Sequence, residues 1–222
     1  MTGIARHFRW AIPVTDFRVA GVPQPEALIL AGPNGAGKTT SSAGILPAGI
    51  RFLNADLIAE RLFADGHPRA GLDIAAGRLL LGHLGEVVTA EESFCVETNL
   101  ADRGYAKRIT VWHQHGYTVR LVFSALESPE LAVRRVATRV ASGGHDVPEE
   151  VIRRRWAAGL RALFDIYMPI VDGWVLLNSN ERNVVEVATG DREASEVLDP
   201  LRWEKILRAA TEAGAAAPRR LL

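Results

Sequence analysis

Short apolar runs alternate along the chain with longer segments in which apolar residues recur every three or four positions. The runs indicate buried strands, and the wider spacing is the 3.6-residue period of amphipathic helices. Strands that alternate with helices across short connections predict a parallel sheet with helices on both faces. The expected strands lie in residues 27–31, 50–56, 93–97, 117–126, 173–178 and 183–190.

The helices between these runs have recognisable ends. Asn54 or Asp56 can cap the second helix, because both side chains accept hydrogen bonds from the free backbone N–H groups of a helix start. Pro148 suits the first turn of the sixth helix. The expected helices comprise residues 37–46, 55–66, 72–88, 102–114, 128–142, 148–168 and 200–213.

The composition is that of an ordinary globular protein. Of 222 residues, 48% are apolar and 23% are charged, and the formal net charge is zero. A neutral chain offers no electrostatic argument for binding nucleic acid or a membrane surface. The sequence has one cysteine, no apolar run long enough to cross a bilayer and no signal-peptide core at its N-terminus. We therefore expect a cytoplasmic protein with neither a nucleic-acid nor a membrane partner.

The segment AGPNGAGKTT, residues 31–40, fits the phosphate-loop pattern G-x-x-x-x-G-K-[ST]. Consecutive backbone N–H groups in such a loop cradle phosphate oxygens, and the following helix adds partial positive charge. Lys38 would reach the outer phosphates, and the Thr39 hydroxyl would bind magnesium. Lysine stands out here because only three of the 26 basic residues are lysines. The expected nucleotide-binding residues are Gly32, Pro33, Asn34, Gly35, Ala36, Gly37, Lys38, Thr39 and Thr40.

Two carboxylates follow strands of the predicted sheet. Asp56 lies just past the second strand, and Glu97 ends the third. Because the carboxyl ends of parallel strands meet at the ligand crevice, both should face the phosphate loop. Phosphoryl transfer to a hydroxyl benefits from one carboxylate that accepts the proton and another that orients magnesium, and we place Asp56, Glu97 and the adjacent Thr98 at the substrate. The alternatives are a first-turn helix residue for Asp56 and a solvated strand-end carboxylate for Glu97.

Six arginines occupy two helices joined by glycines. Gly143 and Gly144 form the joint of a helical hairpin, at about residues 128–170, that we expect to close over the phosphates as a lid. Charge on the transferred phosphoryl group calls for cationic donors, and we select Arg139 and Arg154 for this role. The alternative is that these helix faces are solvated salt-bridge surfaces. The six arginines are Arg134, Arg135, Arg139, Arg153, Arg154 and Arg155.

These elements divide the chain into three regions. An N-terminal lead-in covers residues 1–26, a P-loop kinase domain that includes the lid covers residues 27–200, and a C-terminal helix and tail cover residues 201–222. The predicted fold class is α/β, with a P-loop NTPase-type parallel sheet, helices on both faces and a helical lid.

Taken in order, these pieces resemble the zeta-toxin family of P-loop kinases, in particular its shorter, zeta-like members. They are PNGAGKTT, NAD, ETNL at a strand end, RVATRVASGGHDVPEEVIRRRW and a late strand ending in LLNSN, between about Ala27 and Ser179. The resemblance implies an ATP-dependent kinase that phosphorylates the amino-sugar hydroxyl of UDP-N-acetylglucosamine. It also implies a toxin whose ATP site is blocked by an antitoxin protein.

The resemblance extends to single residues. Asp56 matches the catalytic base of the family, and Lys38 matches its phosphate lysine. Glu97 matches an acidic residue of the substrate or metal site. Arg139 and Arg154 match the paired arginines around the transferred phosphate.

The sequence therefore predicts a kinase that uses Mg²⁺ with ATP, or with GTP, to phosphorylate a hydroxyl group of a small molecule. UDP-N-acetylglucosamine is the first candidate acceptor. A nucleoside, another sugar or an antibiotic is the alternative acceptor. A different class of function is a P-loop ATPase switch, in which hydrolysis drives binding to a protein.

Overall fold

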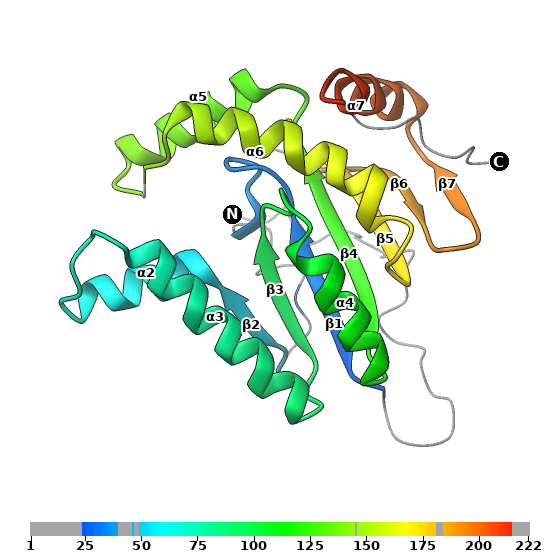
Figure 1. The fold of residues 1–222 in the computed structure, drawn as a ribbon. Coiled ribbons are helices and arrows are strands. Elements are labelled where there is room, and N and C mark those ends of the chain that lie inside the picture. The colour runs from blue at the N-terminus through cyan, green and yellow to red at the C-terminus, as the bar shows by residue number, and fades with distance from the viewer. Residues whose placement is uncertain (1–23, 40–45, 47–48, 145, 181–183, 215–222) are drawn as a thin grey trace, which may run out of the picture.

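The computed structural model describes residues 24–39, 46, 49–144, 146–180 and 184–214. Seven strands form one sheet in the order β2-β3-β1-β4-β5-β6-β7 (Figure 1). Neighbouring strands from β2 to β5 in this order are parallel, whereas β6 and β7 are antiparallel. The strands are β1 (Glu26–Ala31), β2 (Arg51–Asn54), β3 (Phe94–Thr98), β4 (Thr118–Ala125), β5 (Gly173–Asn178), β6 (Val185–Gly190) and β7 (Ser195–Val197).

The predicted α/β class with a P-loop NTPase-type sheet is confirmed, and one edge of the sheet differs from the prediction. The sequence pattern predicts parallel strands throughout, but β6 returns antiparallel to β5. Residues 179–184, which connect these two strands, are too few for the crossover that a parallel pair requires. The short strand β7 was not predicted.

Helices were predicted correctly in number and order within the described residues, with one exception. The expected helix at 148–168 is an α-helix, α6, that continues as a π-helical turn, η1. Of the helix expected at 37–46, the described residues are Gly37, Lys38, Thr39 and Leu46; Lys38 and Thr39 are helical, whereas Gly37 precedes the helix and Leu46 lies in a bend. The helices are α2 (Ala55–Ala64), α3 (Leu72–Thr89), α4 (Gly104–Gln114), α5 (Pro129–Ala141), α6 (Glu149–Ala162), η1 (Leu163–Tyr167) and α7 (Pro200–Glu212).

Capping residues account for several helix starts. Asn54 caps α2, and its side chain accepts hydrogen bonds from the backbone N–H groups of Asp56 and Leu57. Ser128 and Asp199 cap α5 and α7 in the same way, each followed by a proline that needs no N–H partner. Pro148 lies at the cap position of α6, one place before the predicted first turn.

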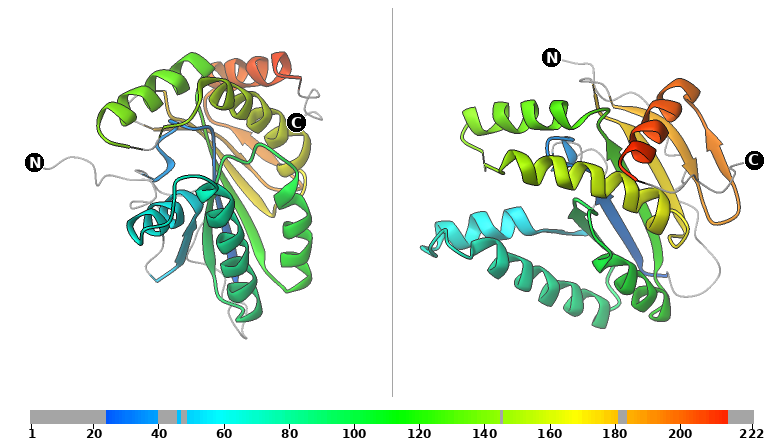
Figure 2. Two further views of the ribbon diagram at one scale, coloured as in Figure 1. Left: turned by 60° about the vertical axis from the view of Figure 1, so that its left-hand side comes forward. Right: turned by 45° about the horizontal axis from the view of Figure 1, so that its top comes forward.

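The core is unequal on the two faces of the sheet. One face packs against the described helices, which Figures 1 and 2 show gathered on that side. Alternate residues of β1, such as Ala27 and Ile29, belong to this larger cluster. Leu28 and Leu30 point to the other face, where they pack in a smaller cluster that includes the fully buried Cys95. This period of two is what a sheet buried on both faces requires.

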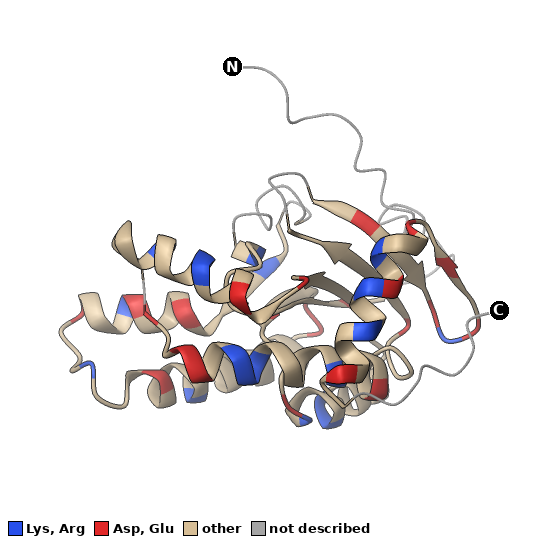
Figure 3. Ribbon diagram, turned by 90° about the horizontal axis from the view of Figure 1, so that it is seen from above, with Lys and Arg blue, Asp and Glu red and all other residues tan. Residues whose placement is uncertain are grey.

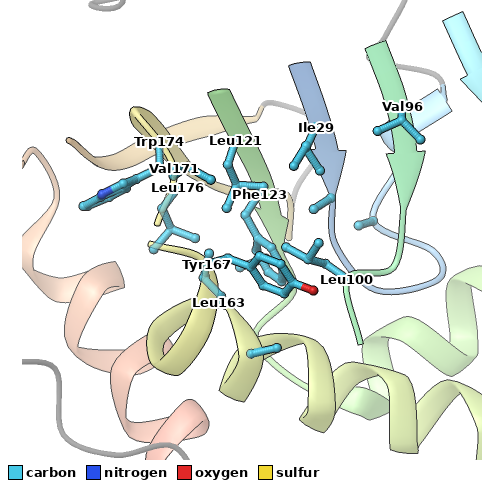
Figure 4. Packing of buried hydrophobic residues seen from close by; sticks show 14 of the residues in the cluster. Ile29, Val96, Leu100, Leu121, Phe123, Leu163, Tyr167, Val171, Trp174 and Leu176 are labelled. Atoms are coloured by element: carbon cyan, nitrogen blue, oxygen red, sulfur yellow. The ribbon is translucent and has the colours of Figure 1, made fainter. Parts of the chain in front are cut away.

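The π-helical turn η1 anchors the C-terminal end of α6 in the larger cluster. Its Tyr167 is fully buried beside Phe123, Leu100 and Leu163 (Figure 4). The Tyr167 hydroxyl donates a hydrogen bond to the carbonyl oxygen of Asp102 at 2.5 Å. Burial raises the pKa of this hydroxyl to about 12. The lid helix α6 is therefore held firmly at one end.

Charged residues of both signs are interspersed on the same helices, as Figure 3 shows. In the part of the chain that the structure describes, no helix is both long enough and apolar enough to span a bilayer.

Candidate active site

A cleft of about 690 Å³ opens at the carboxyl ends of β1, β2 and β3. Strand β1 lies between β3 and β4, so the loop that follows it stands where the chain order reverses, the usual ligand position in open α/β sheets. The predicted residues that line this cleft are Asn34, Gly35, Gly37, Lys38, Thr39, Asp56, Glu97, Thr98, Arg139 and Arg154. Elements far apart in sequence are thus brought together at one site, while their chemical roles remain predictions.

The phosphate loop depends on glycine for its path. Gly32 and Gly35 have φ values of +139° and +80°, in the left-handed range that favours glycine. A Cβ atom at Gly32 would lie 2.4 Å from the carbonyl oxygen of Ser124 on β4. One at Gly35 would lie 2.9 Å from that of Ala132 on α5. The loop is therefore closely packed between strand and lid. Thr40, the last predicted loop residue, lies outside the described residues.

Lys38 lies folded back over its own loop. Its ammonium nitrogen donates hydrogen bonds to the carbonyl oxygens of Gly32, at 2.8 Å, and Pro33, at 3.1 Å. Glu97 Oε1 is 3.9 Å from the same nitrogen, and the Lys38 side chain is only 8% exposed. Burial lowers the pKa of Lys38, and the nearby carboxylates oppose that shift. The lysine is held close to where a phosphate would sit, by contacts that a phosphate could replace.

Glu97 is the centre of a hydrogen-bond network at the ends of β2 and β3. The Thr39 hydroxyl is within hydrogen-bonding distance of both of its carboxylate oxygens, at 3.1 and 3.0 Å. Asn54 Nδ2 donates to Oε2 at 3.0 Å. The Glu97 side chain is only 9% exposed, which excludes the alternative of a solvated strand-end carboxylate.

The donor set at this point fits Mg²⁺. The Thr39 hydroxyl and the Glu97 carboxylate offer the oxygen ligands that this ion prefers. Among the described residues, no group of three or more His, Cys, Asp or Glu side chains forms an all-protein metal cage. Few protein ligands suit Mg²⁺, which is commonly bound through one or two carboxylates together with substrate phosphates.

Asp56 is exposed in the first turn of α2 and lines the cleft. Its charge acts on Lys38, where it raises the lysine pKa against the effect of burial. The position is also favourable for the helix, because a carboxylate at a helix N-terminus interacts well with the dipole. Asp56 therefore lies both at the start of α2 and in the wall of the cleft, a location that is compatible with its predicted role as the base.

The lid arginines divide into two groups. Arg139 and Arg154 are exposed and line the cleft. Arg135 and Arg155 also line the cleft but are half-buried. Arg153 instead forms ion pairs with Glu130, at 2.6 Å, and Glu149, at 2.8 Å. The salt-bridge alternative therefore holds for Arg153, and the phosphate role of the arginines that line the cleft stays a prediction.

Two further arginines fasten the lid to the phosphate loop. Arg135 Nη2 donates to the carbonyl oxygen of Asn180 at 2.7 Å, and its Nη1 donates to that of Gly35 at 3.4 Å. Arg155 Nη1 approaches Asn34 Oδ1 at 3.5 Å. Sequence reasoning grouped these residues with the other arginines and assigned them no role. Their contacts make α5 and α6 part of the wall around the loop.

Several cleft residues were missed from the sequence. Asp73 of α3 lines the cleft together with Ala76 and Leu80, and this spacing of three and four residues places them on one helix face. That periodicity could have identified Asp73. Tyr105 and Asp146 also line the cleft. Burial raises the Tyr105 pKa to about 12. No sequence signal marked Tyr105 or Asp146.

Comparisons with known proteins agree with this architecture. A family model described as an AAA domain matches residues 28–163, which contain the loop, both carboxylates and most of the lid. An uncharacterized protein of Haemophilus influenzae is 28% identical over 135 residues, or 61% of this chain and 95% of that protein.

Solved structures show the same fold at low sequence identity. The AvrRxo1-ORF1:-ORF2 crystal structure with ATP superposes with a TM-score of 0.69 at 19% identity, over 89% of this chain and 67% of that one. The PezAT chromosomal toxin–antitoxin system of Streptococcus pneumoniae gives a TM-score of 0.55 at 16% identity, over 86% of each chain. At identities this low, the superpositions establish a shared fold and nothing further.

Proposed function

The chain belongs to the AAA domain family, and on that premise we propose that it is an ATP-dependent kinase that phosphorylates a hydroxyl group of a small molecule. The observation that carries this proposal is the convergence in one cleft of a phosphate loop, two carboxylates and exposed lid arginines. Hydrolysis needs no second binding wall, but this cleft extends past Asp56 along α3 to Leu80 and Tyr105. That extension leaves room for an acceptor beside the phosphates.

The residues of the cleft divide the work of transfer. Backbone N–H groups of the loop and Lys38 bind the outer phosphates, so Lys38 must exchange its contacts with the carbonyls of Gly32 and Pro33 for the nucleotide. Thr39 and Glu97 would hold Mg²⁺, which when bound offsets the charge of the phosphates. The lid arginines Arg139 and Arg154 donate hydrogen bonds to the phosphoryl oxygens as their charge develops.

Asp56 orients the acceptor and takes its proton. The acceptor oxygen forms a bond to the terminal phosphorus while the bond from that phosphorus to the bridging oxygen breaks, and ADP leaves with the bond's electrons. The hydroxyl proton passes to the Asp56 carboxylate and from there to water. An exposed carboxylate can release this proton readily, because solvent reaches it directly.

UDP-N-acetylglucosamine is the first acceptor to test. The support is the resemblance of the ordered motifs to the zeta-toxin family, and a nucleoside, another sugar or an antibiotic is the alternative. The structural neighbours crystallised with ATP and from a toxin–antitoxin system support two further parts of the proposal. These are ATP rather than GTP as the donor, and a protein antitoxin as a partner in the cytoplasm.

Mass spectrometry of a metabolite extract incubated with the protein, Mg²⁺ and ATP tests the proposal directly. We expect one compound to gain the mass of a phosphoryl group, and the Lys38→Ala variant to abolish that gain. UDP-N-acetylglucosamine added alone then tests the named acceptor. ATP hydrolysis that a protein stimulates, with no phosphorylated small molecule, would contradict the kinase and support a switch.

A further inference from the structure

We propose that Asn54 is a positioning residue that keeps Glu97 and Asp56 in register with each other while the nucleotide is bound. This inference rests on the proposed kinase function. One side chain contacts both parts of the machinery, since its amide touches the Glu97 carboxylate and the backbone N–H of Asp56. Sequence reasoning considered Asn54 only as a possible helix cap.

The contacts of Asn54 define the orientation of its amide. Oδ1 accepts hydrogen bonds from the N–H groups of Asp56, at 2.7 Å, and Leu57, at 3.3 Å. Nδ2 donates to Glu97 Oε2 at 3.0 Å. A backbone N–H can only donate and a carboxylate can only accept, so the flipped amide would oppose like groups on both sides. The residue is 5% exposed, and burial makes such a mismatch costly.

Strand pairing brings these groups together. Asn54 ends β2 directly opposite Glu97 on β3 in the parallel register. The next residues along the chain begin α2, which carries Asp56 in its first turn. Asn54 therefore joins the end of β2 to the start of α2, and a shift of the Glu97 carboxylate or of the Asp56 backbone would strain the same amide.

Nucleotide binding makes this contact more important. Glu97 now interacts with the Thr39 hydroxyl and lies 3.9 Å from the Lys38 ammonium. In the proposed reaction Thr39 turns to the metal and Lys38 to the phosphates. Of these three described partners of Glu97, Asn54 is the one that the nucleotide does not require. Its amide then keeps the carboxylate aimed at the metal position.

Two substitutions separate this role from helix capping. Serine and aspartate cap helices about as well as asparagine, so Asn54→Ser and Asn54→Asp preserve the start of α2. Both remove the N–H donor to Glu97, and aspartate does so with hardly any change of shape. Asp199→Ala is the matched control, because it removes the cap of α7 without touching the cleft.

The experiment measures ATP affinity by calorimetry with and without Mg²⁺, and acceptor phosphorylation at saturating substrates. For both Asn54 variants we expect unchanged affinity for ATP alone, and a loss of about 10- to 100-fold in the Mg²⁺-dependent gain in affinity and in turnover, the usual effect of removing an outer-shell partner. The melting temperature of Asn54→Ser should stay near wild type, whereas that of Asn54→Asp should fall, because two carboxylates then face each other in a buried site. Asp199→Ala should lower the melting temperature and leave both binding and turnover unchanged.

The outcomes distinguish this inference from the proposed function. Wild-type turnover and Mg²⁺ dependence in both Asn54 variants would overturn the positioning role while leaving the kinase intact. If no small molecule is phosphorylated by the wild type, the kinase proposal fails. The loss of Mg²⁺-dependent ATP affinity in the variants would still support the link between Asn54 and Glu97. If Asn54→Asp fails to fold, Asn54→Ser decides, because serine caps α2 without placing a second carboxylate beside Glu97.

Discussion

The two walls of the cleft are built on different principles. On the strand side, Lys38, Glu97 and Asn54 are almost completely buried and bonded to one another or to backbone carbonyls. On the lid side, Arg139 and Arg154 are exposed on helices. Buried, mutually bonded groups cannot move without losing several contacts at once. The sheet thus prepares a rigid place for phosphate and metal, and the lid supplies positive charge on the solvent side of the cleft.

The largest expected effect comes from Asp56, an exposed residue in the first turn of α2 next to the strand wall. Asp56→Asn removes the acceptor for the hydroxyl proton with hardly any change of shape, so phosphoryl transfer should fall by about two to four orders of magnitude. ATP affinity, measured in the same variant, should stay near wild type because the loop supplies the phosphate contacts. Retained transfer would return Asp56 to a simple first-turn residue, and lost ATP affinity would move it to the metal site.

The next effect tests the lid wall. Arg139→Ala should lower turnover at saturation by about 10²- to 10³-fold, the usual effect of losing one donor to developing charge, with little change in ATP affinity. Arg134→Ala is the control, since Arg134 is exposed on the same helix but does not line the cleft. If Arg139→Ala weakens ATP binding and leaves saturated turnover intact, the lid serves ground-state binding instead.

Lys38→Ala tests the strand wall, where the lysine is buried. Loss of a charge-assisted hydrogen bond of about 1.5–3 kcal/mol corresponds to an ATP affinity lower by about 10- to 100-fold. The melting temperature should change little, because relief from burying a charged lysine offsets the loss of its contacts with the carbonyls of Gly32 and Pro33. Titration calorimetry and thermal melts measure the two quantities, with the exposed Lys107→Ala as the control. Undiminished ATP affinity would show that the loop holds phosphate without its lysine.

The smallest effect concerns the acceptor end of the cleft. Tyr105→Phe removes the hydroxyl group of this cleft-lining residue and keeps the ring, so we expect the acceptor KM to rise about fivefold, the equivalent of about 1 kcal/mol for one lost hydrogen bond to the acceptor. ATP affinity should be unchanged, and steady-state kinetics with each substrate varied in turn measures both. A change confined to the ATP parameters would place Tyr105 on the nucleotide side.

The phosphate loop could be predicted from sequence because its motif prescribes the backbone path itself. Gly32 must be glycine whatever surrounds it, and the preceding apolar run places the loop at the end of a strand. The ends of most helices were predictable for a similar reason, because caps such as Asn54 and Ser128 act on residues adjacent in the chain. Local chemistry is readable from local sequence.

What escaped prediction depends on contacts between distant segments. The bond from Asn54 to Glu97 requires the register of β2 against β3, which neither strand reveals alone. The arginines of the lid look alike in sequence, and only the packing of α5 on α6 directs Arg153 to Glu130 and Arg139 to the cleft. Strand β7 has three residues and no apolar run, so its pairing with β6 supplies its stability.

The burial of Cys95 gives this protein a practical advantage in spectroscopy. It is the single cysteine of the chain, it is fully buried in the smaller cluster, and burial raises the pKa of its thiol. A buried, protonated thiol reacts slowly with maleimide dyes. Fluorophores attached to new cysteines at the exposed Thr138 on α5 and Arg78 on α3 would therefore report the distance between these two helices, with the native cysteine left in place.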